Sequence, residues 1–339
     1  MRPIHVGLLG YGLAGQVFHA PLIALAPGLK LQAVASSRTE QIARELPGVA
    51  VEPTAEALLA RDDIELIIVA TPNDLHFPQA MAALQAGKHV VIDKPFALSL
   101  ADADALIAMA TRQRRLLSVF QNRRWDSGFL TARAVIASGR LGEVFYYEAH
   151  FDRFRPMPKP GWREQPGAGA GVFLDLGAHL VDQVLCLFGM PDAVSADIQP
   201  QRPEARVDDY FHLILHYGRR RAVLHASCLT ALPGPSLQVH GDGGSLLVHG
   251  QDNQEAILRA RLAGTPSPNA AVTATLADAA GSTAVPVQPG DYPAYYAAIA
   301  QAIAQDTPPP VLATEARQAL AVMLAARASA ESGQRIALE

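Results

Sequence analysis

Hydrophobic and polar positions alternate between two patterns along the first 120 residues. Short apolar runs rich in β-branched residues predict strands at 4–9, 31–35, 65–70, 89–93 and 116–120. The amphipathic stretches between them predict helices at 40–46, 54–60, 74–86 and 99–114. Thr54 and Ser99 are typical of helix starts, because their hydroxyl oxygens accept hydrogen bonds from the first turn. Strands that alternate with helices in this way predict a parallel sheet covered on both faces.

After residue 120 the pattern changes. Helices are predicted at 126–138, 176–188, 292–305 and 314–331, and strands at 143–152, 207–217, 221–230 and 236–240. Residues 260–290 are rich in Ala, Thr, Pro and Gly and predict a loop. Alternating strands joined by short glycine turns form antiparallel sheets. We therefore expect two domains, 1–120 and 121–339, the second being α+β with a large, mostly antiparallel open sheet.

Composition excludes several classes of protein. The chain has 339 residues, enough for two domains, and its net charge of −4 provides no basic surface for nucleic acid. Cys186 and Cys228 are too few for a disulfide framework or a four-thiolate zinc site. No apolar run is long enough to span a membrane, and the first residues show no signal-peptide pattern. We expect a cytoplasmic protein without a nucleic-acid or membrane partner.

A glycine-rich turn, Gly10-Tyr11-Gly12-Leu13-Ala14-Gly15, follows the first predicted strand and opens a helix. Gly10 allows a tight turn, Gly12 lets a pyrophosphate approach the backbone, and Gly15 lets helix and strand pack closely. An ordinary glycine turn is the alternative, but the flanking strand and helix are those of a dinucleotide site. The pattern predicts a Rossmann domain of the α/β class, with Leu13 and Ala14 beside the cofactor.

The end of the second predicted strand departs from the usual NAD pattern. NAD sites place an acid about 20 residues after the glycines, where it binds the ribose 2′-hydroxyl. Here the chain has Ser36, Ser37 and Arg38, and two hydroxyls with a guanidinium suit a 2′-phosphate instead. A solvated arginine in a turn is the alternative. The pattern favours NADP, with NAD as the second choice.

Polar residues also follow the predicted strand at 65–70, on the same ligand-binding edge of the sheet. Thr71, Asn73 and His76 are candidates for contacts to the nicotinamide half of the cofactor or its ribose. The alternative is structural, with Asp74 as a helix cap and His76 as a satisfied loop histidine. Sequence alone leaves both open.

Asp93-Lys94-Pro95 ends the predicted strand at 89–93. A lysine there lies at the carboxyl edge of the sheet, where open α/β folds bind ligands. Pro95 stops the strand and restricts the backbone of Lys94, so the starting direction of the amine is largely fixed. A solvated lysine before a turn is the alternative. The other motifs favour a functional Lys94.

The second polar constellation contains Asp175 and His179, four residues apart and on one face of a predicted helix. The glycine-rich stretch 167–171 before them allows a ligand to approach the backbone. A histidine beside a carboxylate is a base near neutral pH, suited to take a hydroxyl proton. Alternatively, Asp175 caps the helix and His179 is structural, and this motif alone does not decide.

The three motifs resemble those of a known family. Gly10/Gly12/Gly15, Asp93-Lys94-Pro95 and Asp175-x-Gly177-x-His179 occur in the order and separations of the glucose-fructose oxidoreductase, inositol dehydrogenase and rhizopine catabolism (Gfo/Idh/MocA) family. That family usually has Glu-Lys-Pro where this chain has Asp-Lys-Pro, a change that retains the lysine. The segments 18–22, 121–126 and 151–156 resemble the subgroup with NADP-dependent scyllo-inositol 2-dehydrogenases.

The resemblance implies roles for the matching positions. Lys94, Asp175 and His179 form the implied catalytic set: His179 is the acid/base, Lys94 polarises the reacting oxygen, and Asp175 orients His179 or a substrate hydroxyl. The implied cofactor contacts outside the glycine turn and its neighbours are Asp93, Lys94, Asn122, Trp162 and Arg163. The implied polyol contacts beyond the catalytic set are Asn122, Asp152, Arg153 and Tyr295. Pairing of Arg153 with Asp152, and packing of Tyr295 in a helix, are the structural alternatives.

These roles imply reversible oxidation of a secondary ring alcohol of a cyclic polyol or sugar to the ketone, with hydride transfer to NAD(P). We expect no metal in this reaction, because the histidines lack zinc-type spacing. Two alternatives stay open: a glycosidase that uses NAD for transient oxidation, and a non-catalytic dinucleotide sensor. An open sheet with one apolar face commonly packs on a second copy, so we expect a homodimer or homotetramer. The polyol and the physiological direction are not specified by the sequence.

Overall fold

The computed structural model describes residues 2–167, 169–269 and 272–338, apart from the side chain of Trp162. Its contacts divide the chain into two compact units. The first unit contains Met1–Asn122, Gln254–Pro268 and Asp291–Arg317. The second contains the remaining segments, Arg123–Asn253, Asn269–Gly290 and Gln318–Glu339.

The first unit is built on a six-stranded sheet in which every pairing is parallel. In chain order the strands are β1 (Ile4–Leu9), β2 (Leu29–Ala35), β3 (Ala50–Glu52), β4 (Leu66–Val69), β5 (His89–Ile92) and β6 (Leu117–Val119). Their spatial order is β3-β2-β1-β4-β5-β6. The order reverses between β1 and β4, and ligands of such sheets bind beyond the carboxyl ends of the strands at this point. The predicted Rossmann domain is confirmed.

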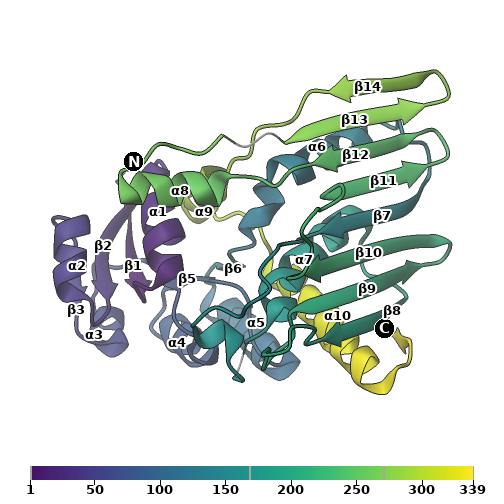
Figure 1. Cartoon of the computed structure of the whole chain (residues 1–339). Coiled ribbons are helices and arrows are strands. Elements are labelled where there is room, and N and C mark those ends of the chain that lie inside the picture. Colours follow the sequence, from purple (N-terminus) through teal and green to yellow (C-terminus); the bar gives the residue numbers. More distant parts are fainter. Residues whose placement is uncertain (1, 168, 270–271, 339) are drawn as a thin grey trace. The chain divides into compact units, whose positions relative to one another are not determined.

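Helices connect these parallel strands (Figure 1). They are the π-helix η1 (Gly15–His19), α1 (Ala20–Leu25), α2 (Thr39–Glu45), α3 (Ala55–Leu59), the 3₁₀ turn η2 (Asn73–Leu75), α4 (His76–Gln85) and α5 (Leu100–Gln113). The two predicted caps are confirmed: Thr54 Oγ1 accepts from Ala57 N at 3.2 Å, and Ser99 Oγ from Asp102 N at 3.1 Å. Each satisfies one of the backbone donors that a helix start leaves unpaired.

Two later helices, α8 (Gln254–Ala263) and α9 (Pro293–Gln305), also belong to the first unit. Tyr295 and Tyr296 of α9 are fully buried, and their rings pack on Phe120 at centroid distances of 5.1 and 5.7 Å. The two compact units therefore differ from the expected domains 1–120 and 121–339, because the first unit also contains later segments of the chain. These aromatic contacts are the physical reason, because they join α9 to the segment after β6.

The second unit is built on a nine-stranded sheet of spatial order β14-β13-β12-β11-β7-β10-β9-β8-β15. Its strands are β7 (Val144–His150), β8 (Ala193–Gln199), β9 (Tyr210–Tyr217), β10 (Arg220–Ser227), β11 (Leu237–Gly241), β12 (Ser245–His249), β13 (Thr273–Asp278), β14 (Gly281–Val285) and β15 (Ile336–Ala337). All pairings are antiparallel except that of β7 with β10. This confirms the predicted mostly antiparallel sheet.

Helices of the second unit cover one face of that sheet, and lie behind it in Figure 1. They are α6 (Ser127–Ala137), α7 (Ala178–Phe188) with the π-helix η5 (Phe173–Gly177) directly before it, and the part of α10 (Ala313–Ser332) from residue 318 on. Two 3₁₀ turns, η3 (Asn122–Trp125) and η4 (Trp162–Glu164), lie in the connecting segments. Alternate strand residues such as Tyr147 and Ala149 pack against them in one hydrophobic core. The intervening residues, which include Glu148 and His150, lie on the opposite face.

The prediction of a loop at 260–290 was partly wrong. The end of α8 lies in it, and so do β13 and β14. Residues 281–284 of β14 are exposed, so this edge strand has no buried apolar face for a sequence pattern to reveal. Within the described ranges, no helix is long and apolar enough to cross a membrane.

Candidate active site

The glycine turn after β1 has the geometry of a pyrophosphate cradle. Gly10 has φ +91°, and a Cβ there would lie 2.7 Å from the carbonyl oxygen of Ala70. A Cβ on Gly15 would clash with the carbonyl oxygen of Gly10, so these two glycines are required by the fold. A Cβ on Gly12 would meet no atom within 4 Å. Gly12 therefore leaves space that a phosphate can occupy at the start of η1. Leu13 is exposed beside it, and Ala14 is half-buried.

The turn after β2 presents Ser36, Ser37 and Arg38 at the same edge of the sheet. The Ser36 hydroxyl accepts from the backbone N of Arg38 at 3.2 Å, which fixes the turn. The Arg38 side chain is exposed, and its guanidinium makes no ion pair within the described part of the chain. The acid at the end of the neighbouring strand, Glu52, is engaged by Arg61 at 2.8 Å. This corner thus offers an unpaired cation and hydroxyls to a ligand.

The turn after β4 splits the predicted residues into two groups. Thr71 and Asn73 are half-buried at the edge, and the Thr71 hydroxyl donates to Gln79 Oε1 at 2.7 Å. His76 is 1% exposed, with Nδ1 2.8 Å from the Pro95 carbonyl oxygen and Nε2 3.0 Å from that of Thr71. The structure supports the alternative for His76: it ties the Thr71 and Pro95 turns together and offers no surface to a cofactor.

Lys94 follows β5 and lies half-buried beyond its carboxyl end. Its backbone N donates to Asp93 Oδ1 at 2.8 Å, and the Lys94–Pro95 peptide is cis. Burial alone would raise the pKa of Asp93, but the nearby imidazole of His19 and the charge of Lys94 lower it overall. An ionised carboxylate therefore lies beside the lysine.

His19 supports this corner, a role that sequence reasoning missed. It is fully buried, with Nε2 3.8 Å from Asp93 Oδ2 and Nδ1 2.6 Å from the hydroxyl of Tyr296. The aromatic surroundings include Phe120, 4.7 Å away between ring centroids. Tyr296 is 277 residues further along the chain, so no local signal pointed to this contact. His19 positions Asp93, the residue that precedes Lys94.

Asn122 follows β6 and is 6% exposed. The residues directly after it are anchored in the second unit. Arg124 forms a bidentate pair with Asp182 of α7, at 2.8 and 2.7 Å, and Gln183 Nε2 donates to the Arg123 carbonyl oxygen at 2.7 Å. Asp182 therefore serves to hold the segment after Asn122 against α7.

Asp175 and His179 lie on η5 and α7, and a buried carboxylate sets where η5 begins. Asp208 Oδ1 accepts from Phe173 N at 2.6 Å, and its carbonyl accepts from Val172 N at 2.9 Å. A Cβ on the preceding Gly171, where φ is +93°, would lie within 2.7 Å of the Asp208 carboxyl group. The predicted helix at 176–188 thus starts earlier, and with a π-turn, because Asp208 fixes its first residues. His179 is 6% exposed.

Arg163 of η4 lies near Asp175, with 3.7 Å between Nε and Oδ1. Its carbonyl oxygen accepts from Gly171 N at 3.1 Å, and the next residue, Glu164, pairs with buried Arg202 at 2.6 Å. These bonds hold the Arg163 turn against the glycine-rich segment. The side chain of Trp162 lies outside the described residues.

Three predicted polyol contacts have different surroundings. Arg153 is half-buried; burial and then the charge of Arg155 lower its pKa, while Asp175 acts in the opposite sense. Asp152 does not pair with Arg153: its oxygens face His150 Nδ1 at 3.0 Å and His225 Nδ1 at 2.9 Å. Tyr295 is fully buried in the first unit and donates to Ser118 Oγ at 2.9 Å. The structural alternative therefore holds for Tyr295, and the Asp152 carboxylate is already engaged.

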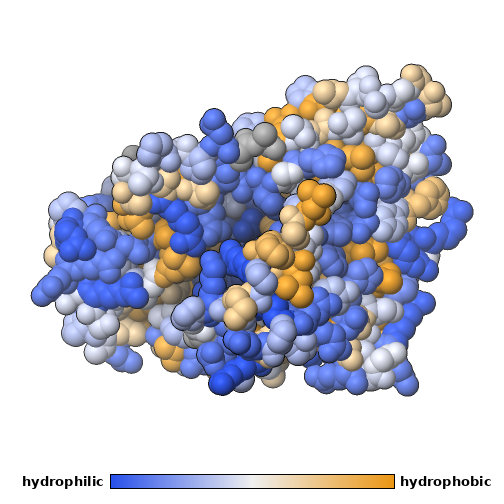
Figure 2. Space-filling model, in the orientation of Figure 1, coloured by the Kyte–Doolittle hydropathy of each residue, from blue (hydrophilic) through white to orange (hydrophobic). Residues whose placement is uncertain are grey.

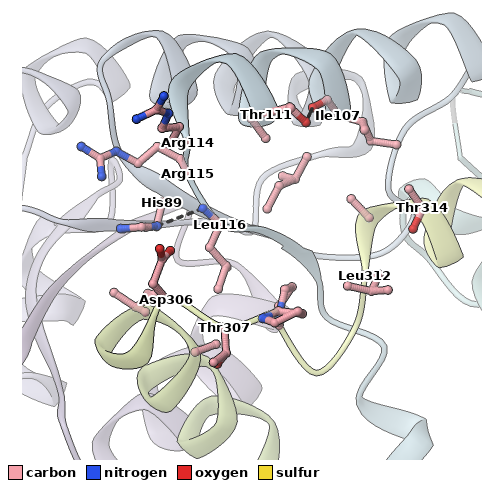
Figure 3. A pocket seen from close by; sticks show the side chains of 17 residues that line it. His89, Ile107, Thr111, Arg114, Arg115, Leu116, Asp306, Thr307, Leu312 and Thr314 are labelled. Carbon is pink, nitrogen blue, oxygen red and sulfur yellow. Dashed lines mark hydrogen bonds between the residues drawn. The ribbon is translucent and has the colours of Figure 1, made fainter.

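A pocket of about 520 Å³ opens in the first unit at the opposite, amino edge of the sheet (Figure 3). His89 at the start of β5 lines it, together with Arg114, Arg115 and Asp306. His89 Nδ1 accepts from Leu116 N at 3.0 Å. Burial, and then the charge of Arg115, lower the pKa of His89 to about 4. This pocket is not at the carboxyl edge, where the glycine turn and Lys94 lie.

Comparisons with known proteins agree with this architecture. The family models "Oxidoreductase family, NAD-binding Rossmann fold" and "Oxidoreductase family, C-terminal alpha/beta domain" (Gfo/Idh/MocA) match residues 4–121 and 133–338. The uncharacterised oxidoreductase YdgJ of Escherichia coli is 46% identical over 94% of this chain and 93% of its own length. The scyllo-inositol 2-dehydrogenase (NADP⁺) IolW of Bacillus subtilis is 38% identical over 99% of this chain and 96% of its own. A solved structure of a putative oxidoreductase from Klebsiella pneumoniae covers 100% of this chain and 96% of that one, with 42% identity and a TM-score of 0.91.

Proposed function

The chain belongs to the Gfo/Idh/MocA oxidoreductase family, and we propose that it interconverts a secondary alcohol of a cyclic polyol and the corresponding ketone, with NADP as the preferred cofactor. The observation that carries the proposal is the position of Lys94. It lies beyond β5 at the carboxyl edge of the sheet, and the glycine turn lies at the same edge beyond β1, with β4 between the two strands. The preferred polyol, scyllo-inositol, is proposed from the named activity of the relative IolW.

The proposal assigns a proton to His179 and a charge to Lys94. His179 takes the proton of the substrate hydroxyl as the alcohol is oxidised, and returns it in the reverse direction. The ammonium group of Lys94 stabilises the negative charge that develops on the same oxygen. Asp175, four residues before His179, orients it or binds a neighbouring hydroxyl, and Arg163 near Asp175 keeps that carboxylate in place.

The residues present fit a phosphorylated dinucleotide. Gly12 leaves open space at the start of η1, and Arg38 offers an unpaired guanidinium where the 2′-phosphate of the adenosine ribose is expected. When bound, the nicotinamide supplies the redox chemistry by accepting or giving a hydride. Thr71, Asn73, Asp93 and Asn122 remain proposed contacts at the same edge.

For the polyol, we keep Asn122 and Arg153 as proposed contacts beside the catalytic set, since both carry hydrogen-bonding groups that are not committed to the core. Asp152 and Tyr295 are left out because their polar atoms are engaged elsewhere. We also propose that the protein is a homo-oligomer, since one face of the nine-stranded sheet is covered by helices and the other presents its strands.

The test is a substrate panel read by absorbance of the reduced nicotinamide. Purified protein should oxidise scyllo-inositol and other inositols with NADP. The same oxidation should be slower with NAD. Lys94→Ala should reduce turnover by at least about 100-fold, the scale of one electrostatic group at a reacting oxygen. Lys30→Ala is the matched control, because Lys30 is an exposed lysine of the same unit. Turnover of Lys94→Ala equal to that of the control would refute the assignment, and silence of the wild type across the panel would refute the proposed substrate class.

A further inference from the structure

The face of the nine-stranded sheet opposite the helices carries a compact group of titratable side chains. Over the strands of the second unit, Figure 2 shows a surface that is mostly hydrophilic, with smaller hydrophobic patches. On this face of the sheet His150 of β7 is in register with His225 of β10, and their ring centroids are 4.9 Å apart. Asp152, two residues after His150, points to the same side, and its two oxygens each contact Nδ1 of one ring.

We propose that His150, Asp152 and His225 form a binding site for a divalent transition-metal cation of the zinc class, separate from the residues that carry the oxidoreductase chemistry. One ligand atom from each residue lies within 4.8 Å of the others. The contacts to Asp152 are 3.0 Å from His150 Nδ1 and 2.9 Å from His225 Nδ1. Ligand atoms of a tetrahedral zinc ion lie about 3.3 Å apart, so both histidine–aspartate contacts are close to the spacing that an ion requires.

The partner of His150 on its other side is the second observation. Glu148 Oε1 lies 2.7 Å from His150 Nε2, and Glu148 is itself held by the hydroxyl of Tyr146 at 2.6 Å. A histidine that binds a metal through one nitrogen commonly donates from the other to a carboxylate. A proton on Nε2 leaves a lone pair on Nδ1, directed at the Asp152 carboxylate. Two acceptors at 3.0 Å require a positive charge between them, from a proton or a cation.

His225 is the third observation. Its Nδ1 is buried and lacks a hydrogen bond of acceptable geometry within the described residues, although Asp152 Oδ1 is only 2.9 Å away. Nδ1 of His225 is therefore available as a ligand atom beside the Asp152 carboxylate. Two histidines and one carboxylate suit zinc, cobalt(II) or nickel(II).

Local residue spacing does not reveal this group, because its side chains come from two strands. His150 and Asp152 are two residues apart, whereas His225 follows 73 residues later and reaches them only through the parallel pairing of β7 and β10. The site therefore depends on the pairing of the two strands.

The experiment uses untagged full-length protein, stripped with a chelator and titrated with Co²⁺ and with Zn²⁺. We expect one equivalent of Zn²⁺ by calorimetry, and visible Co²⁺ absorption bands typical of a low-coordinate nitrogen–oxygen site. His225→Ala should abolish the Co²⁺ bands, and Glu148→Gln should weaken binding about 10- to 100-fold, the range for the partner of a ligand histidine. His240→Ala is the matched control: His240 lies on β11 and bonds to Ser245 Oγ at 2.8 Å, outside the three ligands.

Circular dichroism of each variant shows whether it is folded, and Glu148→Gln keeps the test valid if His225→Ala does not fold. The proposal is overturned if the wild type binds no stoichiometric ion, which would mean that a proton occupies the position between His150 and Asp152. It is equally overturned if Glu148→Gln binds as tightly as wild type, or if His240→Ala weakens binding as much as Glu148→Gln does. None of these readouts involves the cofactor or the polyol, so they are independent of the proposed function.

Discussion

Replacing Arg38 with alanine should change the cofactor preference without changing the stability of the fold. The guanidinium is exposed and makes no ion pair among the described residues, so its removal breaks no internal contact. A hydrogen bond to a charged partner contributes about 1.5–3 kcal/mol, which corresponds to a factor of about 10–150 in affinity. Screening at an exposed site favours the lower end of this range at physiological salt. Affinity for NAD should change by less than about 2-fold, because NAD lacks the phosphate.

The assay is a titration of NADP and NAD, by nicotinamide fluorescence or by kcat/KM, at two salt concentrations. Arg44→Ala is the control, because Arg44 is an exposed arginine of α2, the helix that follows Arg38, with only a loose contact of 3.7 Å to Glu45. NADP affinity should fall for Arg38→Ala alone, and the difference should shrink as salt rises. Equal losses for NADP and NAD, or equal losses in the two variants, would show that Arg38 does not contact a 2′-phosphate.

Three further predictions concern the cradle, the pocket and the buried ion pair. Gly12→Ala should keep the melting temperature of the wild type but weaken NADP binding, whereas Gly15→Ala should lower the free energy of unfolding by about 1–3 kcal/mol. Calorimetry and cofactor titration distinguish the two variants. The reverse pattern would contradict the proposed pyrophosphate cradle. His89 has a folded-state pKa of about 4, below its ordinary 6.5, so the unfolded chain binds the proton more readily between these values. Stability should therefore fall as the pH drops from about 6.5 to about 4, by at most about 3 kcal/mol, and urea unfolding of His89→Asn should lack this component. Arg124→Met should cost about 3–5 kcal/mol in urea unfolding because it leaves buried Asp182 without its bidentate partner, and a loss below about 1 kcal/mol would contradict that reasoning.

The parts of the fold that the sequence predicted have strong local signals. The apolar runs of the first unit, the glycine turn and the cap at Ser99 each depend on residues within a few positions of one another. Lys94 was placed correctly at the end of β5 because a strand and a proline bracket it. The parallel direction of the strands then follows from the general rules for strands that are connected by helices.

The parts that the sequence did not predict depend on distant contacts. Tyr295 was a candidate for the polyol, but its ring packs against Phe120, which is far away in the chain. The sequence did not decide whether His76 contacts the cofactor or has a structural role, because its partner, the carbonyl of Pro95, is 19 residues away. The helical segment was predicted to begin at residue 176 but begins at Phe173, because Asp208, 35 residues away, accepts a hydrogen bond from the backbone N of Phe173. In each case hydrogen bonding or packing, not local pattern, determines the role.

The central claim, direct transfer of hydrogen between a ring carbon and NADP, is tested most directly with scyllo-inositol deuterated at its ring carbons. After incubation with the protein and NADP, the reduced cofactor is analysed by mass spectrometry. The account predicts that each reduced cofactor carries one deuterium and that Lys94→Ala forms very little of it. Reduced cofactor without deuterium, or none at all with cofactor still bound to the protein, would contradict the claim.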